Sequence, residues 1–260
     1  MCGIIGIQNN KEAATLAYMG LYAQQHRGQE GAGVVSSDGK NLHRHMGQGL
    51  VSEVFSNPKV FDSLIGNSAI GHVRYSTTGD SDPKNVGPLT FNMGEYSLSI
   101  AHNGNLVNIE GIRKQLQEDG ALFQTSTDTE IIIHLLAREK GKTLAEKLGK
   151  VLQKIEGAYS LILLSPYEII AARDPHGIRP FCMGKLRDTI VFASETCALD
   201  LLGAEYVREV NPGEMIVAND DGFYSQSFTE PEEPKHCIFE YIYFSRPDSQ
   251  IFGKNVDKMR

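Results

Sequence analysis

The sequence predicts an α+β fold with mostly antiparallel sheets. Segments typical of strands recur through the first hundred residues, three helical segments follow, and strand-like segments then return. A block of helices between two blocks of strands is typical of this class, whereas regular alternation of strand and helix indicates a parallel sheet. The chain has 260 residues, 41% of them hydrophobic, which is enough to bury one large core or two modest ones.

The first elements follow from local composition. MCGIIGI opens the chain with a short apolar stretch that predicts a strand over residues 2–8. KEAATLAYMGLYAQQ, at 11–25, is rich in good helix formers and is expected to end before Arg27-Gly28. Short strands separated by Gly, Asn and Asp turns follow, namely GVVSS, LHRHM, AIGHVRY, LTFNM and YSLSIAH.

The middle of the chain predicts three helices, at 105–118, 129–139 and 143–155. In the last of them, aliphatic residues recur at spacings that place them on one helix face. Strands are expected again in AYSLILLS, EIIAARD, TIVFASE and EMIVAN. NDDG predicts a hairpin turn before FYSQSF, so the acidic pair Asp220-Asp221 is assigned to that turn.

Residues 1–235 are expected to form one domain. Its end is marked by TEPEEPK, an acidic, proline-bearing stretch that is typical of a linker. The remaining residues, 236–260, begin with the aromatic run HCIFEYIYFSRPDS and are too few for a domain of their own. They end in the start of a helix without a Gly or Asn cap, which predicts a tail packed on the first domain or a chain cut from a longer one.

Charge and composition exclude several classes of protein. Acidic residues number 32 against 25 basic ones, and no block of Lys or Arg occurs, which argues against nucleic acid or an anionic membrane as the main partner. No signal peptide is recognisable, and the apolar runs fall short of the roughly 20 residues that span a bilayer, so a cytoplasmic location is expected. The four cysteines lack metal-binding spacing, so neither a disulfide framework nor a zinc site is expected.

Cys2 is the first candidate catalytic residue. Once the initiator methionine is removed, Cys2 carries a free α-amino group beside its thiol, so that nucleophile and general base belong to one residue. An α-amine with a pKa of about 7.7–8.0 can accept the thiol proton near neutral pH. Such a pair suits attack on an amide or ester carbonyl. A buried cysteine in a strand is the alternative that MCGIIGI alone leaves open.

AHNGN, at 101–105, supplies a candidate oxyanion hole. Asn103 offers a side-chain amide and Gly104 an unobstructed backbone N–H, and such donors stabilise a tetrahedral oxyanion. An ordinary Asn-Gly turn is the alternative. His72 and His102 lie in the same motifs and leave open a Cys/His dyad in which a histidine is the base.

Three charged residues predict an amino-acid substrate. Arg74, in GHVRYSTTG, and Arg27, in QHRGQEGAG, can each hold a carboxylate or make an ordinary salt bridge. Asp128 lies at a helix start, where Thr127 and Glu130 form a predicted capping box, so its carboxylate remains available for a substrate ammonium. A thiol nucleophile, an oxyanion hole, an arginine and an aspartate together describe a site for glutamine.

Five motifs, in their order along the chain, resemble those of the class II glutamine amidotransferases: MCGIIGI, QHRGQEGAG, GHVRYSTTG, AHNGNL and TSTDTE. The resemblance covers nearly the whole chain. It implies an N-terminal-nucleophile hydrolase fold, which is a four-layer αββα sandwich. It also implies that Cys2 is the nucleophile, that its amine is the base, and that Asn103 and Gly104 form the oxyanion hole.

The same resemblance assigns substrate binding. It implies that Arg74 holds the α-carboxylate of glutamine with help from Arg27, and that Asp128 binds the α-ammonium group. A loop around 74–84 is expected to close over bound glutamine. Glutamine would then be hydrolysed to glutamate and ammonia through a thioester on Cys2, a reaction that needs no cofactor and no metal within this chain.

Further motifs, including RDPHGIRP, ASETCALD and CIFEYIYFSRPDS, resemble the members of this class that pass ammonia to phosphoribosyl pyrophosphate. Those members form 5-phosphoribosylamine, the first step of de novo purine (IMP) synthesis. Residues 236–260 would be the linker and start of their phosphoribosyltransferase domain, whose pyrophosphate-binding loop has no counterpart here. That domain would bind phosphoribosyl pyrophosphate with Mg²⁺. A [4Fe-4S] cluster with Cys237 as a ligand, and a homo-oligomer, a tetramer, are expected only for the full-length protein.

Two other functions remain open at this point. The glutaminase domain can feed a different acceptor, as in the relatives that form hexosamines or asparagine, although FEYIYFSRPDS weighs against this alternative. The other possibility is a non-catalytic module that binds a ligand or a partner domain, in which the Cys-Gly start serves only as a strand.

Overall fold

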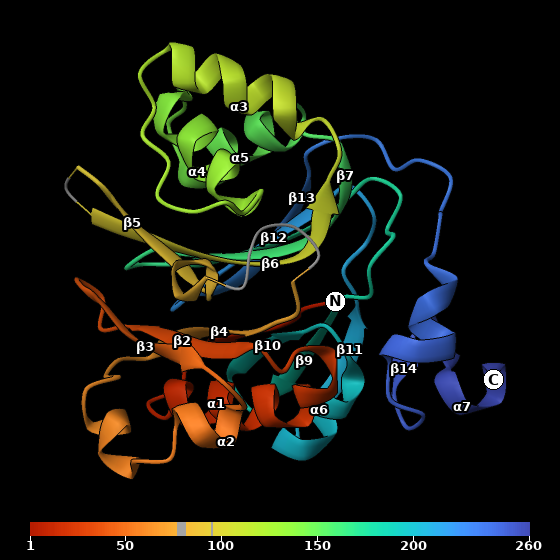
Figure 1. Cartoon of the computed structure of the whole chain (residues 1–260). Coiled ribbons are helices and arrows are strands. Elements are labelled where there is room, and N and C mark those ends of the chain that lie inside the picture. Colours follow the sequence, from red (N-terminus) through yellow and green to blue (C-terminus); the bar gives the residue numbers. More distant parts are fainter. Residues whose placement is uncertain (77–81, 95) are drawn as a thin grey trace.

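The structure is a computed structural model that describes residues 1–76, 82–94 and 96–260. Two antiparallel sheets lie face to face, and helices cover the outer side of each, which gives a four-layer αββα sandwich (Figure 1). The predicted fold class is therefore confirmed. In the part of the chain described here, no helix is both long and apolar enough to cross a membrane.

The first sheet holds β1 (Gly3–Gln8) at its centre. β1 pairs with β10 on one side and β4 on the other, so the strand that follows Cys2 is fixed along both edges. The strand order is β11-β9-β10-β1-β4-β2-β3, with antiparallel neighbours throughout. The other strands are β2 (Gly31–Ser37), β3 (Leu42–Gln48), β4 (Ser68–Arg74), β9 (Cys182–Leu186), β10 (Thr189–Ala193) and β11 (Glu205–Glu209).

The second sheet has the order β13-β12-β8-β7-β6-β5, again antiparallel. Its long strand β6 (Tyr96–Leu106) carries the predicted oxyanion pair near its end. The other strands are β5 (Leu89–Met93), β7 (Gly157–Leu164), β8 (Ile169–Arg173), β12 (Glu214–Asn219) and β13 (Gly222–Ser227). Asn219 pairs with Gly222, which confirms the predicted turn at Asp220-Asp221.

Alternating side chains divide the interior into a central core and two outer cores. Ile4 of β1 faces the central core between the sheets, together with Ala101 and Ile162 from the second sheet. Ile5 and Ile7 point the other way and pack beneath α1, because successive side chains of a strand face opposite sides. The site described below lies where the ends of β1, β4 and β6 approach one another.

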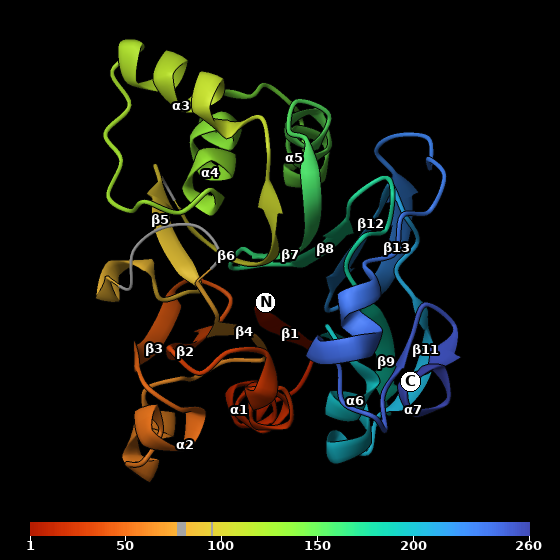
Figure 2. The same ribbon diagram turned by 45° about the vertical axis from the view of Figure 1, so that its right-hand side comes forward.

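Short helices form the two outer layers, as Figure 2 also shows. The first sheet is covered by α1 (Ala13–Ala23), α2 (Val51–Val54) and α6 (Thr196–Leu202), and the second by α3 (Ile109–Glu118), α4 (Thr129–Arg138) and α5 (Leu144–Leu152). The prediction of a helix over 105–118 was wrong at its start. Asn105 and Leu106 continue β6, because they pair with Ala158 and Gly157 of β7.

Residues 236–260, called the tail from here on, dock beside the first sheet. The π-helix η4 (Glu240–Phe244) is followed by the small hairpin β14 (Gln250–Ile251) and β15 (Lys254–Asn255) and by α7 (Val256–Met259). Ile251, Phe252 and Val256 form a small buried cluster of their own. The backbone N–H of Gln250 donates to Thr196 Oγ1 at 2.8 Å, which joins the tail to α6.

Candidate active site

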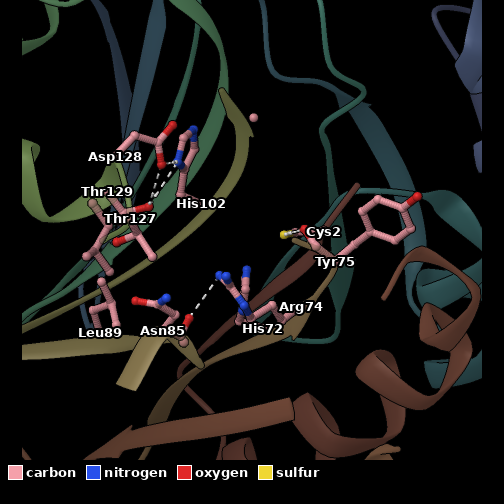
Figure 3. A pocket seen from close by; sticks show the side chains of 13 residues that line it. Cys2, His72, Arg74, Tyr75, Asn85, Leu89, His102, Thr127, Asp128 and Thr129 are labelled. Atoms are coloured by element: carbon pink, nitrogen blue, oxygen red, sulfur yellow. Dashed lines mark hydrogen bonds and ion pairs between the residues drawn. The ribbon is translucent and has the colours of Figure 1, made fainter. Parts of the chain in front are cut away.

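Cys2 stands directly before β1 and lines a cavity between the two sheets. Its thiol donates a weak hydrogen bond to the backbone oxygen of Tyr75, with 3.6 Å between Sγ and O. Figure 3 shows the sulfur across the cavity from Asp128 and His102. Gly104, Arg74 and Asp128 line the same cavity, so residues from four of the five motifs meet here.

Asn103 and Gly104 lie on β6, opposite Ser160 and Tyr159 of β7. The side chain of Asn103 is fully buried, and neither its Oδ1 nor its Nδ2 has a hydrogen-bond partner within the described residues. An unpaired buried amide is costly, which makes this side chain a candidate donor, but Asn103 is not among the residues that line the cavity, whereas Gly104 is. A Cβ at position 104 would lie 1.9 Å from the oxygen of Ala158, so only glycine fits there.

Arg74 ends β4 and forms one wall of the cavity. Its Nη1 donates to the backbone oxygen of Asn85 at 3.1 Å, and its Nε lies 3.9 Å from Glu30 Oε2. Glu30 is held in turn by Ser76, whose N–H and hydroxyl both donate to Oε1. The guanidinium is thus buried and oriented, as a bidentate carboxylate-binding group has to be.

Asp128 and His102 form a buried pair on the opposite wall. Asp128 Oδ2 accepts a hydrogen bond from the backbone N–H of Leu106 at 2.9 Å, and Oδ1 lies 3.6 Å from His102 Nδ1. His102 Nδ1 is also 3.1 Å from Thr129 Oγ1. Burial opposes both charges, yet each group stabilises the other, so the pKa of Asp128 is lowered and the pKa of His102 is raised.

His72 lies beside Arg74 and is neutral. Burial, followed by the charge of Arg74, lowers the pKa of His72 to about 3. Among the described residues, neither His72 nor His102 is hydrogen-bonded to the Cys2 thiol, whose one hydrogen bond goes to Tyr75. This geometry favours a general base other than a histidine.

Arg27 does not line the cavity. Its Nε donates to the backbone oxygen of Cys2 at 3.0 Å, whereas its two terminal nitrogens bind the carboxylates of Glu195 and Glu240. The structure thus places Arg27 against the backbone of Cys2 and outside the cavity lining. The expected assistance to Arg74 in holding a carboxylate finds no support in this arrangement.

The capping box expected from Thr127 and Glu130 was wrong. Asp128 is the N-cap residue of α4 and makes no side-chain cap hydrogen bond. The Glu130 carboxylate instead accepts from the backbone N–H groups of Gln124 and Thr125 at 2.8 and 2.7 Å. The conclusion drawn from the box still holds, since the Asp128 carboxylate is not used as a cap and faces the cavity.

Several residues of the site were not predicted from sequence. Tyr75, Asn85 and Thr129 all line the cavity. Thr129 lies within TSTDTE, and Thr127 of the same motif also lines the cavity, but the motif alone does not reveal which of its threonines turn inward. The loop expected around 74–84 includes residues 77–81, which lie outside the described residues.

The remaining cysteines are not among the residues that line the cavity. Cys182 and Cys197 are buried, and burial, followed by the nearby carboxylate of Glu195, raises the pKa of Cys197 to about 12. Cys237 is half-buried and free. Across residues 1–76, 82–94 and 96–260, no three His, Cys, Asp or Glu side chains gather as a metal site, so these residues alone would not hold an iron–sulfur cluster.

Comparison with known proteins agrees with the geometry. A family model described as "Glutamine amidotransferase domain" matches residues 72–201, half of the chain. The amidophosphoribosyltransferase of Bacillus subtilis (strain 168) is 48% identical over 260 residues, which cover 100% of this chain and 54% of the relative. Amidophosphoribosyltransferase 2, chloroplastic, of Arabidopsis thaliana is 49% identical over 261 residues, which cover 100% of this chain and 46% of the relative.

A solved structure matches as well. It is that of glutamine phosphoribosylpyrophosphate amidotransferase from B. subtilis complexed with ADP and GMP, with a TM-score of 0.93 and 48% identity, covering 98% of this chain and 55% of that one. The chain thus spans about half the length of the relatives it matches. With the family model matched over half of its residues, the chain belongs to the glutamine amidotransferase domain family.

Proposed function

We propose that the chain hydrolyses glutamine to glutamate and ammonia with Cys2 as the nucleophile. The observation that carries this proposal is that Cys2, Gly104, Arg74 and Asp128 surround one cavity. A thiol and an oxyanion donor then lie in the same site as a cation for the α-carboxylate and an anion for the α-ammonium of the substrate. This set matches the functional groups of glutamine.

The general base is the α-amine of Cys2 after Met1 has been removed. Burial lowers the pKa of the α-amine of Met1, one residue earlier, to about 5. Since burial at the chain terminus favours the neutral form of an α-amine, the proposal gives Cys2 an amine that is able to take up a proton. It can then accept the proton of the neighbouring thiol.

The reaction proceeds in two halves. The amine takes the thiol proton, the sulfur attacks the carboxamide carbon, and the oxyanion receives hydrogen bonds from Asn103 Nδ2 and the Gly104 N–H. The intermediate collapses as the C–N bond breaks and the protonated amine supplies the proton that completes ammonia. Water then attacks the thioester, with the amine as base, and breakage of the C–S bond releases glutamate and restores the thiol.

Binding of the substrate backbone precedes this chemistry. The guanidinium of Arg74 would donate hydrogen bonds to the α-carboxylate, while Asp128 would accept them from the α-ammonium group. Asp128 is ready to do so because Leu106 and His102 keep it ionised despite burial. Opposite charges on two walls of one cavity also select an α-amino acid over a plain amide.

The fate of ammonia is proposed from the relatives. They are named amidophosphoribosyltransferases, and this chain matches about half of their length. We infer that, within a longer protein, the ammonia converts phosphoribosyl pyrophosphate to 5-phosphoribosylamine at the start of purine synthesis. Residues 1–235 would be the glutaminase domain, and the tail would lead into a transferase domain that binds phosphoribosyl pyrophosphate and Mg²⁺.

Other properties of the longer protein belong to the same proposal. An iron–sulfur cluster would use Cys237 only with ligands from outside the described residues. A tetramer and a cytoplasmic location are proposed for it, while one Arabidopsis relative carries the word chloroplastic in its name. Transfer of ammonia to a hexosamine or asparagine precursor has no observation in its favour.

Replacement of the nucleophile tests the proposal. Cys2→Ala should abolish glutamate release, and the parent should gain one adduct from a diazoketone analogue of glutamine, with the mass of the analogue less dinitrogen. Cys237→Ala is the matched control, because it removes another partly exposed thiol and should keep both the adduct and the activity. An adduct that persists in Cys2→Ala would contradict the assignment, and the mass of the N-terminal peptide reports removal of Met1.

A further inference from the structure

A buried cluster of charges joins the start of the chain to the tail. Arg27, in the short helix η1 (Gln25–Arg27) after α1, has a fully buried side chain. So do Glu195, at the start of α6, and Glu240, in η4 of the tail. Figure 1 shows the tail to the right of the N-terminus.

The guanidinium of Arg27 binds several partners at once, of which the most distant is Ser245 Oγ, 3.4 Å from Nη1. Its Nε donates to the backbone oxygen of Cys2 at 3.0 Å. Its Nη1 and Nη2 bind Glu240 through two hydrogen bonds of 2.9 and 3.0 Å, and Nη1 also binds Glu195 at 2.5 Å. A planar guanidinium cannot turn toward one partner without turning from the others. The position of the Cys2 carbonyl therefore depends on both carboxylates.

Tail residues hold both carboxylates in place. The hydroxyl of Ser245 donates to Glu240 Oε2 at 3.0 Å. Glu195 Oε2 accepts from the backbone N–H of Arg246 at 2.9 Å and from the hydroxyl of Ser249 at 2.7 Å. An undocked tail would remove Glu240 outright and strip Glu195 of these donors, and Arg27 would reorient to recover partners for its charge.

We propose that Glu240 is a positioning residue for the nucleophile: acting through Arg27, it fixes the Cys2 carbonyl, so that the Cys2 thiol is correctly set only while the tail is docked. This inference rests on the proposed function of Cys2. Glu240 itself does not line the cavity and is given no contact with substrate. Its effect should therefore appear in kcat, because the glutamine-binding groups on β4 and α4 stay in place.

The test compares three variants of the whole 260-residue chain. Glu240→Gln removes the charge and one acceptor oxygen. Ser245→Ala keeps that charge and removes the hydroxyl that donates to Glu240 and accepts from Arg27 Nη1 at 3.4 Å, and Asp248→Asn breaks an exposed pair with Arg246 on the same segment. Steady-state kcat and KM for glutamine are measured well below each unfolding midpoint. The rate of Cys2 alkylation by iodoacetamide is measured alongside, because that reagent does not need the glutamine-binding groups.

Glu240→Gln should lower kcat about tenfold or more and slow alkylation, with KM within about twofold of the parent, since small misplacements of a reacting group are costly. Ser245→Ala should shift both rates in the same direction by less. Asp248→Asn should leave them within about twofold, as exposed ion pairs contribute little. A residue that only stabilises the fold would lower the unfolding midpoint without moving kcat or the alkylation rate.

A folded Glu240→Gln variant with parental kcat and alkylation rate would overturn the inference. If Glu240→Gln does not fold, Ser245→Ala decides: lowered rates support the inference and parental rates overturn it. Cys2→Ala is run in parallel to separate the two proposals. Turnover that survives in Cys2→Ala would refute the nucleophile assignment and the inference together. Parental kcat and alkylation rate in Glu240→Gln, with Cys2→Ala inactive, would refute the inference alone.

Discussion

Asp128 uses its two carboxylate oxygens for different contacts: Oδ2 accepts a hydrogen bond from the N–H of Leu106, and Oδ1 forms an ion pair with His102 at 3.6 Å from Nδ1. The first contact ties the carboxylate to the end of β6, which also carries Gly104. The second keeps it ionised. One side chain therefore couples the proposed ammonium site to the strand that bears the proposed oxyanion hole.

Asp128→Asn should weaken glutamine binding. The carboxamide can still accept from Leu106 but no longer pairs with an ammonium, and a hydrogen bond to a charged group contributes about 1.5–3 kcal/mol, so kcat/KM should fall roughly ten- to hundredfold. Steady-state glutamate release measures this loss. The same change should have little effect on 4-carbamoylbutanoate, which lacks the ammonium. Asp119→Asn, an exposed change after α3, is the control, and an equal loss on both substrates would contradict the role.

Asn103→Ala should lower kcat with little change in KM. Loss of one oxyanion donor costs about 10²–10³ in kcat, because the hydrogen bond strengthens only as charge develops on the oxygen. Initial rates over a range of glutamine concentrations separate the two constants. Asn92→Ala, an exposed change on the neighbouring strand β5, should leave both constants unchanged. A rise in KM at constant kcat would instead indicate that Asn103 binds the ground state.

Gly104→Ala should destabilise the fold as well as reduce activity. The new Cβ would approach the backbone oxygen of Ala158 to 1.9 Å, which demands a shift of β7, and overpacking of this kind costs about 1–3 kcal/mol. Gly111→Ala on α3 meets no atom within 4 Å and should instead stabilise the chain by about 0.4–1 kcal/mol. Chemical denaturation of the two variants and the parent measures the unfolding free energies, which should fall for Gly104→Ala and rise for Gly111→Ala.

Acid should weaken the Arg27 cluster at Glu195. Burial works against this carboxylate, but Arg27, followed by His26, lowers its pKa to about 2 from an ordinary 4.5. A lowered carboxyl pKa adds stability that is fully present above pH 4.5 and is lost as pH falls toward 2. The difference in unfolding free energy between the parent and Glu195→Gln should therefore shrink across this window. A difference independent of pH would show that the charge of Glu195 contributes nothing.

Much of the fold and of the cavity was predictable because its signals are local. Strand alternation, helix composition and the NDDG turn each operate within a few residues, and they predicted most strands, three helices in the middle of the chain and mostly antiparallel sheets. The sandwich of two sheets was implied by the family resemblance. The motifs around Cys2, Arg74, Gly104 and Asp128 lie at or near the ends of elements, where side chains of different strands converge. The start of α3 was misplaced because only pairing with β7 decides where β6 ends.

The role of Arg27 could not be predicted in the same way. Its partners Glu195 and Glu240 are 168 and 213 positions away along the chain, and nothing local to QHRGQEGAG indicates them. The true partners of Glu130 were hidden for a related reason. A capping box is a local pattern. In the structure, however, the Glu130 carboxylate binds the loop before α4, and Asp128 faces His102.

The part of the tail around η4 reverses the usual distribution of polarity. Its acidic residue Glu240 is fully enclosed, whereas Ile238, Phe239, Ile242 and Tyr243 around it are more than half exposed. A contact made only by apolar side chains would tolerate a shift by one residue or a partial rotation of the segment. The bidentate pair between the Arg27 guanidinium and the Glu240 carboxylate forms in a single orientation. The pairing with Arg27 therefore fixes the orientation of this segment. Its exposed aromatic side chains then face solvent in one defined orientation.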